Sequence, residues 1–536
     1  MDARIGIIFI YLLGMLAIGL IFRKKSKESR IEFFLAGRNL SMIILFFTMA
    51  ATNFSAFTIF GFSGAGYRIG YSFYPVMGFG TGFMALSFYI IGNKIYRLSR
   101  ERNYITPSDF IGDRYNSPLL KKLFSLVMIV FTLPYIAIQA IASGNSLNSL
   151  VGIPYLTGAL LITGFVVAYV ALGGMHSIAW TDLVQGLMMV TFAFLSLIII
   201  TNKGGGFASV NREVFKSHPE LFYRPGGGDT MGYGIWFGYL VLWFFADPMF
   251  PQLFQRFMVA KDEKSLNTTI VLYPIITTFL FFLTVSIGVV GKNTFPSLPP
   301  ESTDNIFPLL LGHYTGSIFS TILLTGGLAA LMSTLDSQLL TLTSMVTNDF
   351  MDIKRKEILK EKIIVIVLGA LGLLIAVKPP STILDFINRT TFNGLSVLAP
   401  AVLGGLYWKK ASKSGAFASI IAGEGMVIAY YFRLIRTPNI FPVIPVLLVT
   451  GGIFVAVSLL IPCSNERTEL VFSIRKNAIP WIFVFSMLFI LGNDFWNWGR
   501  KPVLLGGLPL WVWYFFGLGI LLSITFKLFV ESRESS

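Results

Sequence analysis

A polar cluster inside a long apolar segment is the part of the sequence best suited to chemistry. Within residues 316–348, five of the six positions from 333 to 338 are polar: Ser333, Thr334, Asp336, Ser337 and Gln338. Such side chains are costly in hydrocarbon unless they face a cavity or a polar partner. Hydroxyl and carbonyl oxygens are hard ligands that suit a small alkali cation. Hydrogen bonding between helices is the alternative use of Ser and Thr, but the acid within the cluster favours cation binding.

Two further apolar segments are interrupted by small, polar or proline residues. Segment 40–66 contains the run AATNFSA at 50–56, and segment 233–258 contains Asp247, Pro248 and Pro251. Transporters often break two helices near the midplane, at matching positions of two repeats, and bind ions on the freed carbonyls. The two segments lie five spans apart, as two repeats of five helices require. Packing or kinking by Gly and Pro, which are frequent in membrane helices, is the alternative.

The composition supplies the setting for these residues. Hydrophobic residues form 54% of the 536-residue chain and charged residues 13%, whereas soluble domains carry about 25% charged residues. About fifteen segments are long and apolar enough to cross a bilayer as helices. Their expected ranges are 4–22, 40–66, 70–96, 119–149, 154–172, 180–201, 233–258, 268–291, 316–348, 362–378, 382–408, 413–432, 440–461, 478–493 and 508–530.

The charge pattern orients these spans. The formal charge of +15 comes from basic residues that gather in alternate loops, such as 23–38, 94–122 and 354–362. This follows the positive-inside rule and predicts an external N-terminus and a cytoplasmic C-terminus. The scatter of the basic residues argues against a nucleic-acid partner. Trp496, Trp498, Trp511 and Trp513 near the end suggest an aromatic belt at the membrane interface.

Other classes of chemistry lack their sequence signals. No glycine-rich loop with a following Lys-Ser/Thr is present, which argues against ATP as the energy source. The chain shows no Ser/His/Asp or metal-hydrolase arrangement and has one cysteine, Cys463, so it has no intramolecular disulfide. We therefore expect a protein that is not an enzyme.

Four separated motifs, in order, resemble those of the sodium/solute symporter family. They are FLAGR at 34–38, GGMHSIAWTDLVQG at 173–186, FPQLFQRF at 250–257 and the segment 329–340. The family includes proline, pantothenate, sialic acid, monocarboxylate and sugar symporters, and the resemblance covers about residues 5–461. It implies an all-α polytopic membrane protein with a LeuT-type inverted repeat of five plus five helices in about thirteen spans, so that two C-terminal spans are additional.

The resemblance also divides the chain. The implied parts are a first span and cytoplasmic loop (1–38), a first five-helix repeat (39–202), a second repeat (203–410), two peripheral helices (411–465) and a C-terminal extension with two further spans (466–536).

Carried onto this sequence, the family's main sodium site implies three carbonyls and two hydroxyls. They are the carbonyls of Ala51, Phe54 and Ala330 and the hydroxyls of Ser333 and Thr334. The second sodium site of some relatives maps to Asp182, Asp336 and Ser337. This sequence departs from those relatives by its carboxylate at 336. Two acids in one site are hard to ionise together without a cation, so a second cation or a proton is expected there. Alternatively, Asp182 pins its helix and Asp336 bonds a neighbouring one.

The resemblance implies solute contacts from the broken second span and four other spans. The candidates are Asn53, Ser55, Phe57, Thr58, Tyr135, Gln139, Trp243 and Asn393. Tyr135 stands where sialic acid carriers place an arginine, which argues against sialic acid. Arg389 either attracts an anion near the pathway or pairs with Asp385. The segments 378–380 and 404–409 look closest to pantothenate and proline carriers.

The expected function is sodium-coupled secondary active symport of a small organic solute by alternating access. The solute would be a monocarboxylate, pantothenate or an amino-acid-like molecule, and the working unit a monomer in the plasma membrane. The partners are then the solute, sodium and the lipid bilayer. Proton coupling on the same fold and a transporter-like sensor are the alternatives. A channel is a third, but the sequence shows no filter-like repeated loop.

Overall fold

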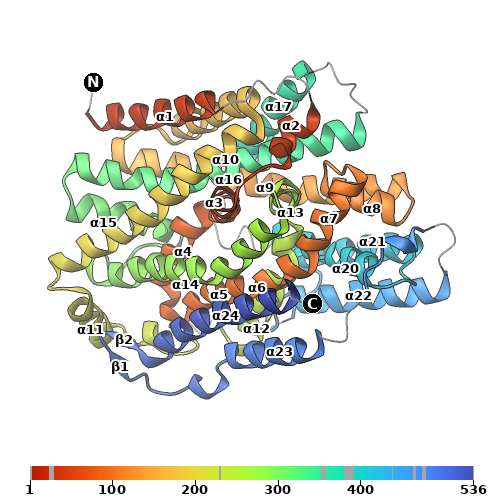
Figure 1. Cartoon of the computed structure of the whole chain (residues 1–536). Coiled ribbons are helices and arrows are strands. Elements are labelled where there is room, and N and C mark those ends of the chain that lie inside the picture. Colours follow the sequence, from red (N-terminus) through yellow and green to blue (C-terminus); the bar gives the residue numbers. More distant parts are fainter. Residues whose placement is uncertain are drawn as a thin grey trace.

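The protein is a bundle of helices that run in several layers (Figure 1). The computed structural model describes residues 3–22, 29–227, 231–351, 358–378, 391–437, 439–462, 466–473 and 478–534. Arg389, Asp385 and Cys463 lie outside these ranges. Among the described residues, nine helices are long and apolar enough to cross a membrane, or ten if a bent pair counts as one span. The count of about fifteen stays a prediction, because other predicted spans are short, broken or more polar helices.

The predicted fifth and sixth spans form one long helix with a sharp turn. Helix α10 runs from Tyr155 to Lys203, and Gly174 within it has φ 63° and ψ −163°. A Cβ at Gly174 would lie 2.7 Å from the carbonyl oxygen of Phe33. Only glycine combines this backbone conformation with so close an approach. The motif around 173–186 therefore turns the chain without a loop and places Asp182 two turns beyond the bend.

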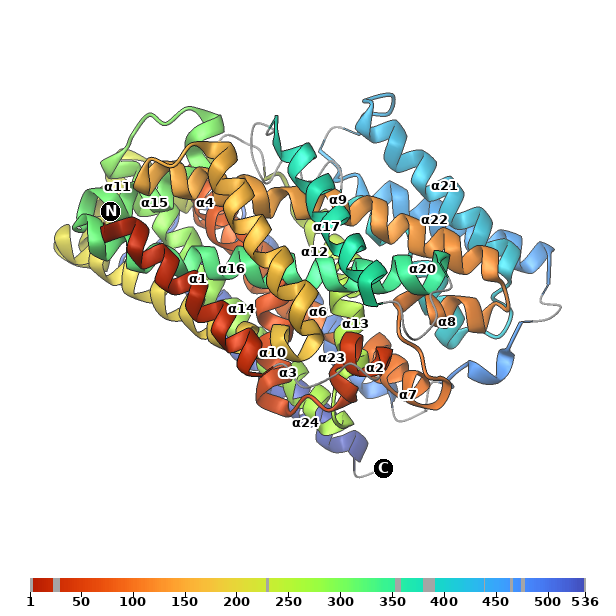
Figure 2. The same cartoon turned by 90° about the horizontal axis from the view of Figure 1, so that it is seen from above.

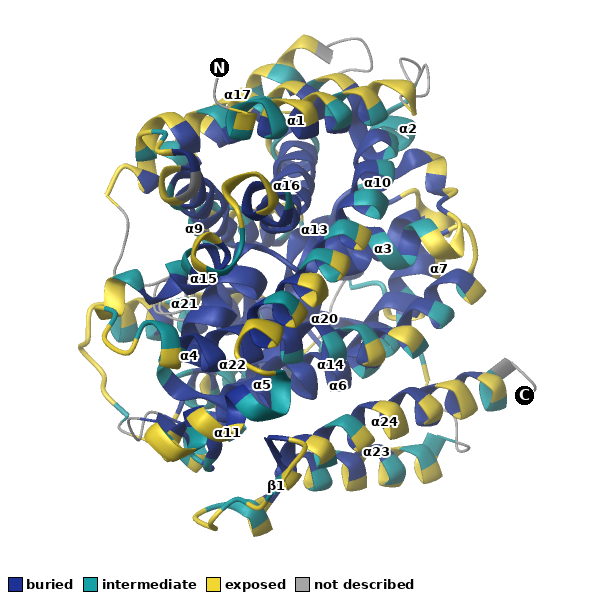
Figure 3. Ribbon diagram, turned by 90° about the vertical axis from the view of Figure 1, so that its left-hand side faces the viewer, coloured by how far each residue is buried: buried dark blue, intermediate teal, exposed yellow. Residues whose placement is uncertain are grey.

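Helix α16 (Ser317–Met345) lies at the centre of the molecule. Every residue from Leu323 to Met345 is buried, and Figure 3 shows this helix enclosed by its neighbours. It packs on α10, α9 (Pro118–Val151) and α3 (Met42–Asn53). The polar cluster at 333–338 is thus surrounded by protein and does not face lipid.

A second group of helices packs around α14 (Glu263–Thr294). Its members are α3, α4 (Phe62–Ile69), α5 (Tyr74–Gly78), α6 (Gly80–Ser87) and α24 (Leu510–Glu534). Helices α21 (Lys413–Tyr431) and α22 (Val443–Leu460) form a separate pair at the edge of the molecule (Figure 2). The segments that follow α10 and α14 carry short helices of their own, α11 (Phe207–Ser217) and α15 (Ile306–Tyr314).

The two C-terminal spans attach to the α14 group. Helix α23 (Ile479–Gly492) lies beside α24, and the two are joined through a small hairpin of β1 (Leu504–Leu505) and β2 (Leu508–Pro509) (Figure 3). A Cβ at Gly519 would lie 2.2 Å from Thr278 Oγ1, and Ser523 donates a hydrogen bond to the carbonyl of Val271 at 2.6 Å. Small residues let the two backbones approach closely here.

A buried arginine, Arg224, joins the C-terminal extension to the segment before α12. Arg224 pairs with Asp494 at 2.7 Å, and both side chains are fully buried. Its guanidinium lies 4.4 Å from the ring centroid of Trp236 and 4.5 Å from that of Trp498. It also contacts the ring of Trp511, which is buried. The interpretation of the tryptophans as a membrane belt is therefore wrong for Trp511, because its indole N–H donates to the carbonyl of Phe222. Trp496 and Trp513 do remain exposed.

Candidate functional site

The predicted second span breaks where the sequence is polar. Helix α3 ends at Asn53, Phe54 is extended, and a π-helical turn, η2 (Phe57–Gly61), leads into α4. The two halves are bent by 60°. Ser55 stabilises the break because its hydroxyl accepts a hydrogen bond from the backbone N–H of Phe57 at 3.1 Å. Such local bonds compete with the hydrogen bonds of a helix. The last carbonyls of α3 are thereby released from the helical pattern.

The predicted seventh span breaks at its prolines. Helix α12 (Tyr233–Ala246) gives way to a 3₁₀ turn, η7 (Asp247–Met249), and then to α13 (Pro251–Val259). Phe250 is extended, with φ −63° and ψ 122°, as expected for a residue before a proline. Both predicted interruptions are therefore present.

The hydroxyls of Ser333 and Thr334 meet the end of α3. Ser333 Oγ lies 3.0 Å from the carbonyl oxygen of Ala51, and Thr334 Oγ1 lies 3.1 Å from that of Thr52. Both hydroxyls also lie within 3.2 Å of the carbonyl oxygen of Ala330. Five oxygens from two helices thus converge in a fully buried place, and this donor set suits a small hard cation.

Four of the five predicted sodium ligands are brought together in this way. They are Ala51, Ala330, Ser333 and Thr334. Phe54 is the fifth; it is buried directly after the end of α3. The carbonyl of Thr52 joins the group although sequence reasoning missed it. The position of Thr52 within the run at 50–56 is the sequence signal that indicates it.

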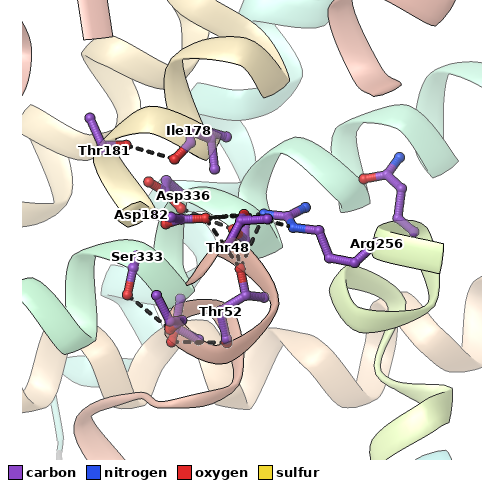
Figure 4. A network of polar contacts seen from close by, with 12 residues as sticks. Thr48, Thr52, Ile178, Thr181, Asp182, Arg256, Ser333 and Asp336 are labelled. Atoms are coloured by element: carbon purple, nitrogen blue, oxygen red, sulfur yellow. Dashed lines mark hydrogen bonds and ion pairs between the residues drawn. The ribbon is translucent and has the colours of Figure 1, made fainter. Parts of the chain in front are cut away.

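A second polar cluster adjoins the first on α16 (Figure 4). Asp182 Oδ2 accepts from the hydroxyl of Thr48, and the guanidinium of Arg256 lies 3.4 Å away. Asp336 accepts from the phenol of Tyr169 at 2.5 Å and from the hydroxyl of Ser337 at 3.1 Å. The predicted residues Asp182, Asp336 and Ser337 are therefore joined in one hydrogen-bonded cluster that also contains an unpredicted arginine.

Aromatic rings gather between the two breaks. The ring of Phe392 lies 4.9 Å from Trp243, 5.9 Å from Phe57, 5.8 Å from Tyr135 and 5.2 Å from Phe250, measured between centroids. Three of these five were predicted solute contacts. Phe250 and Phe392 were missed, although each stands beside a residue that the sequence singled out. The indole N–H of Trp243 and the hydroxyl of Thr58 have no hydrogen-bond partner among the described residues.

The other predicted solute residues hold the break in place. Gln139 Oε1 accepts from the backbone N–H of Ala56 at 3.1 Å, and the phenol of Tyr135 donates to Ser55 Oγ at 3.0 Å. The amide of Asn53 does not face the rings. It donates to Asp247 Oδ2 at 3.2 Å and to the phenol oxygen of Tyr273 at 2.7 Å. Asn53 therefore links the broken second span to the break in the seventh span and to α14.

Comparison with known proteins shows the family of the chain. The model of the sodium:solute symporter family matches residues 33–423. The chain belongs to this family. It is 30% identical over 442 residues to the sodium/pantothenate symporter of Escherichia coli, across 80% of this chain and 90% of that protein. It is 30% identical over 469 residues to the osmoregulated proline transporter of Bacillus subtilis, across 83% and 93% of the two chains.

A solved structure shows the same fold. A substrate-bound, outward-open Na⁺-coupled sialic acid symporter superposes with a TM-score of 0.72 at 20% identity, over 87% of this chain and 99% of that one. The chain is thus a multi-pass membrane protein of the LeuT-type fold. Its family and its relatives are symporters, not enzymes, and they support sodium as the coupled ion.

One side of the symporter holds an open cavity of about 340 Å³. Asn393, the last predicted solute residue, lines it from α19 (Thr391–Ser396). The other lining residues come from α12, α21, α22 and the loop between the last two; they are Ile235, Val427, Tyr430, Tyr431, Thr437, Ile440, Phe441, Pro442 and Val446. The cavity therefore lies at the predicted external ends of these helices.

Polar contacts link several helices on the opposite side of the molecule. Gln255 on α13 accepts from the hydroxyl of Thr341 at 2.6 Å and donates to Ser344 at 3.2 Å. Asp349, just beyond α16, accepts from Ser108 and Ser125 and lies 3.2 Å from Lys121 Nζ. Helices α13, α8 (Pro107–Arg114) and α9 are thereby tied to the predicted cytoplasmic end of α16.

Proposed function

We propose that the protein carries a small organic solute together with sodium across the plasma membrane by alternating access. The observation that supports this most is the convergence of Ser333 and Thr334 on the carbonyl oxygens at the end of α3. These ligands come from two helices that a moving bundle would separate. Ion binding would therefore stabilise the arrangement in which the two helices are in contact.

The proposed sodium ligands are the carbonyls of Ala51, Phe54 and Ala330 and the hydroxyls of Ser333 and Thr334. Neutral oxygens in a buried place suit a monovalent cation, because a divalent ion would usually recruit carboxylates. The break in the second span serves the same purpose, since the C-terminal end of α3 carries the negative end of its helix dipole. The chain's own residues therefore supply both the oxygen ligands and a favourable field.

The proposed solute lies beside this ion, among the rings of Phe57, Tyr135, Trp243, Phe250 and Phe392. Such a chamber favours a compact molecule with an apolar body. Helices η2 and α13 both begin at the breaks. The positive ends of their helix dipoles therefore lie at the breaks and favour the binding of a carboxylate. We therefore propose a monocarboxylate, pantothenate or an amino-acid-like solute, with Asn53, Ser55, Thr58, Gln139 and Asn393 shaping the site.

A missed residue completes this assignment. Gln252 lies at the start of α13, is fully buried, and neither polar atom of its side chain has a hydrogen-bond partner among the described residues. A buried amide without partners is costly. We assign it as a further contact for the polar group of the solute.

Asp182, Asp336 and Ser337 form a candidate second cation or proton site. Two carboxyl groups in one buried cluster favour the uptake of a positive charge, which keeps proton coupling as the second candidate function. A pH-independent uptake rate together with a sodium Hill coefficient of one would contradict this second site.

The decisive experiment uses the purified protein in liposomes. Uptake of labelled proline, pantothenate, short monocarboxylates and sugars is measured with an inward sodium gradient, with choline in place of sodium, and with an inward proton gradient. We expect one of the first three solutes to accumulate only with the sodium gradient. Equal uptake in choline, or accumulation driven only by protons, would refute sodium coupling.

A further inference from the structure

The buried guanidinium of Arg256 lies in the middle of the second cluster. Its side chain is fully buried on α13. Nη2 donates to Ser337 Oγ, and it also donates to Thr52 Oγ1 at 3.1 Å. Nε donates to Thr48 Oγ1 at 3.1 Å. Figure 4 shows the guanidinium and the Asp182 carboxylate directed at each other, with Thr48 and Thr52 beside them. One cation of the chain itself thus contacts oxygens from three other helices.

These contacts connect α13 to three helices that also pack on one another. Thr48 and Thr52 are on α3, Ser337 is on α16, and Asp182 is on α10. Arg256 itself follows the break at 247–250 by less than two turns. A swing of α13 about that break would withdraw the guanidinium from all of its partners at once.

The position of Arg256 relative to the proposed sodium ligands follows from helix geometry. Ser337 lies one turn beyond Ser333 on α16, and Thr48 lies one turn before Thr52 on α3. One turn is about 5.4 Å, so the guanidinium occupies the next layer of the bundle. Helix α16 runs toward the predicted cytoplasmic side, and Ser337 follows Ser333. Arg256 therefore lies on the cytoplasmic side of the sodium ligands, between the two helices that carry them.

We propose that Arg256 is a tethered cation that blocks the passage of sodium from Ser333 and Thr334 toward the cytoplasm until α13 moves. The inference rests on the proposed sodium site. An ion that leaves toward the cytoplasm between α3 and α16 has to pass a fixed positive charge held by Thr48, Thr52, Asp182 and Ser337. Sodium release is thereby tied to the movement of α13.

The cluster has the charges that such a function needs. Two acids, Asp182 and Asp336, adjoin one guanidinium. Asp182 Oδ1 and Arg256 Nη1 are buried without a hydrogen-bond partner among the described residues. When the arginine withdraws, the oxygens of Asp182 and Ser337 become available as the next ligands for the departing ion, because carboxylate and hydroxyl oxygens suit sodium. The same residues then serve as a block in one state and as an exit path in the other.

The test uses Arg256→Gln and its matched control, Gln255→Ala. Gln255 is the adjacent residue and also links α13 to α16, through Thr341 and Ser344. Its side chain makes no hydrogen bond to an acid among the described residues. Proteoliposomes loaded with ²²Na⁺ and free of solute report the leak of sodium. Removing the fixed charge should raise this leak about tenfold in Arg256→Gln, whereas Gln255→Ala and the charge-preserving Arg256→Lys should leak as the wild type does.

Thermal stability supplies a readout that needs no transport. Sodium that binds the folded state raises the melting temperature, and a sodium titration with choline as the balancing ion gives the half-saturating concentration. Loss of the nearby positive charge should lower this concentration about threefold in Arg256→Gln and leave it unchanged in Gln255→Ala. If Arg256→Gln does not fold, the double variant Asp182→Asn with Arg256→Gln removes both members of the pair and is measured in the same way.

The outcomes separate this inference from the proposed function. Wild-type protein without any sodium-dependent uptake or stabilisation would refute the sodium site itself. A wild-type protein that couples sodium, together with an Arg256→Gln variant whose leak and sodium affinity match those of Gln255→Ala, would show that Arg256 is only a structural link.

Discussion

Ser333 Oγ lies 3.0 Å from the carbonyl oxygen of Ala51, although 282 residues separate the two in the chain. The contact joins the centre of α16 to the end of the broken α3. Thr334 repeats the arrangement with Thr52, at 3.1 Å. One pair of adjacent hydroxyls on α16 therefore faces the last turn of α3, where the helix has released its carbonyls.

This relationship predicts a loss of sodium affinity in Ser333→Ala and Thr334→Ala. Each change removes one oxygen ligand, and a bond to a charged group contributes about 1.5–3 kcal/mol. The sodium concentration for half-maximal uptake should rise about tenfold or more in each variant. Thr343→Ala is the matched control, because Thr343 is a fully buried hydroxyl on the same helix that donates only to the carbonyl of Leu339 within it. Unchanged sodium dependence in both test variants would contradict the site.

The meeting of the two interrupted segments could be expected from the sequence, because polar groups in an apolar helix are conspicuous. The runs at 50–56 and 333–338 interrupt long hydrophobic segments, and the structure brings them together. Arg256 lies within the motif at 250–257, yet its proposed role depends on Asp182 and Thr48, which only the packing of α10 and α3 places beside it. Phe392 was missed for a different reason. One aromatic ring among the 51 phenylalanines of the chain carries no signal of its own.

The same limit applies to Arg224 and its tryptophans. Trp residues near the end of a membrane protein are typical of an interfacial belt, and the sequence contains nothing that links Trp511 to an arginine nearly 300 residues earlier. The buried pair of Arg224 and Asp494 explains the position of Trp511, because it holds the C-terminal extension against the loop before α12.

Tyr135→Phe should weaken solute binding without affecting sodium. The change keeps the ring that packs on Phe392 and removes the phenol that donates to Ser55 at the break. A single neutral hydrogen bond contributes about 0.5–1.5 kcal/mol, so the KM for the solute should rise about three- to tenfold. Tyr155→Phe loses a comparable phenol, which donates to the carbonyl of Ala376 away from the rings, and should behave as the wild type does. An equal change in both variants would argue against a solute contact at Tyr135.

Arg224→Ala should destabilise the protein strongly. Removing one member of a buried ion pair costs about 3–5 kcal/mol, because it leaves Asp494 as an uncompensated buried charge. The loss of contacts with Trp236 and Trp498 adds to this effect. The pair of Arg97 and Glu263 lies at the surface, so Arg97→Ala should cost about 1 kcal/mol or less. Melting temperatures of the purified variants test the difference, and similar shifts for both would mean that the buried arginine does not anchor the extension.

Two glycines on α24 offer the sharpest test of how the last span is attached. A Cβ at Gly519 would lie 2.2 Å from Thr278 Oγ1 on α14, whereas a Cβ at Gly517, on the same helix, would have no atom within 4 Å. Gly519→Val should force α24 away from α14 at a cost of about 1–3 kcal/mol, and Gly517→Val should have little effect. Both variants gain the same β-branched side chain in the same helix, so their helix propensities change equally. Gly519→Val should therefore lower the melting temperature and slow sodium-driven uptake, while Gly517→Val should change neither. Equal melting temperatures for the two variants would contradict the close packing of α24 on α14.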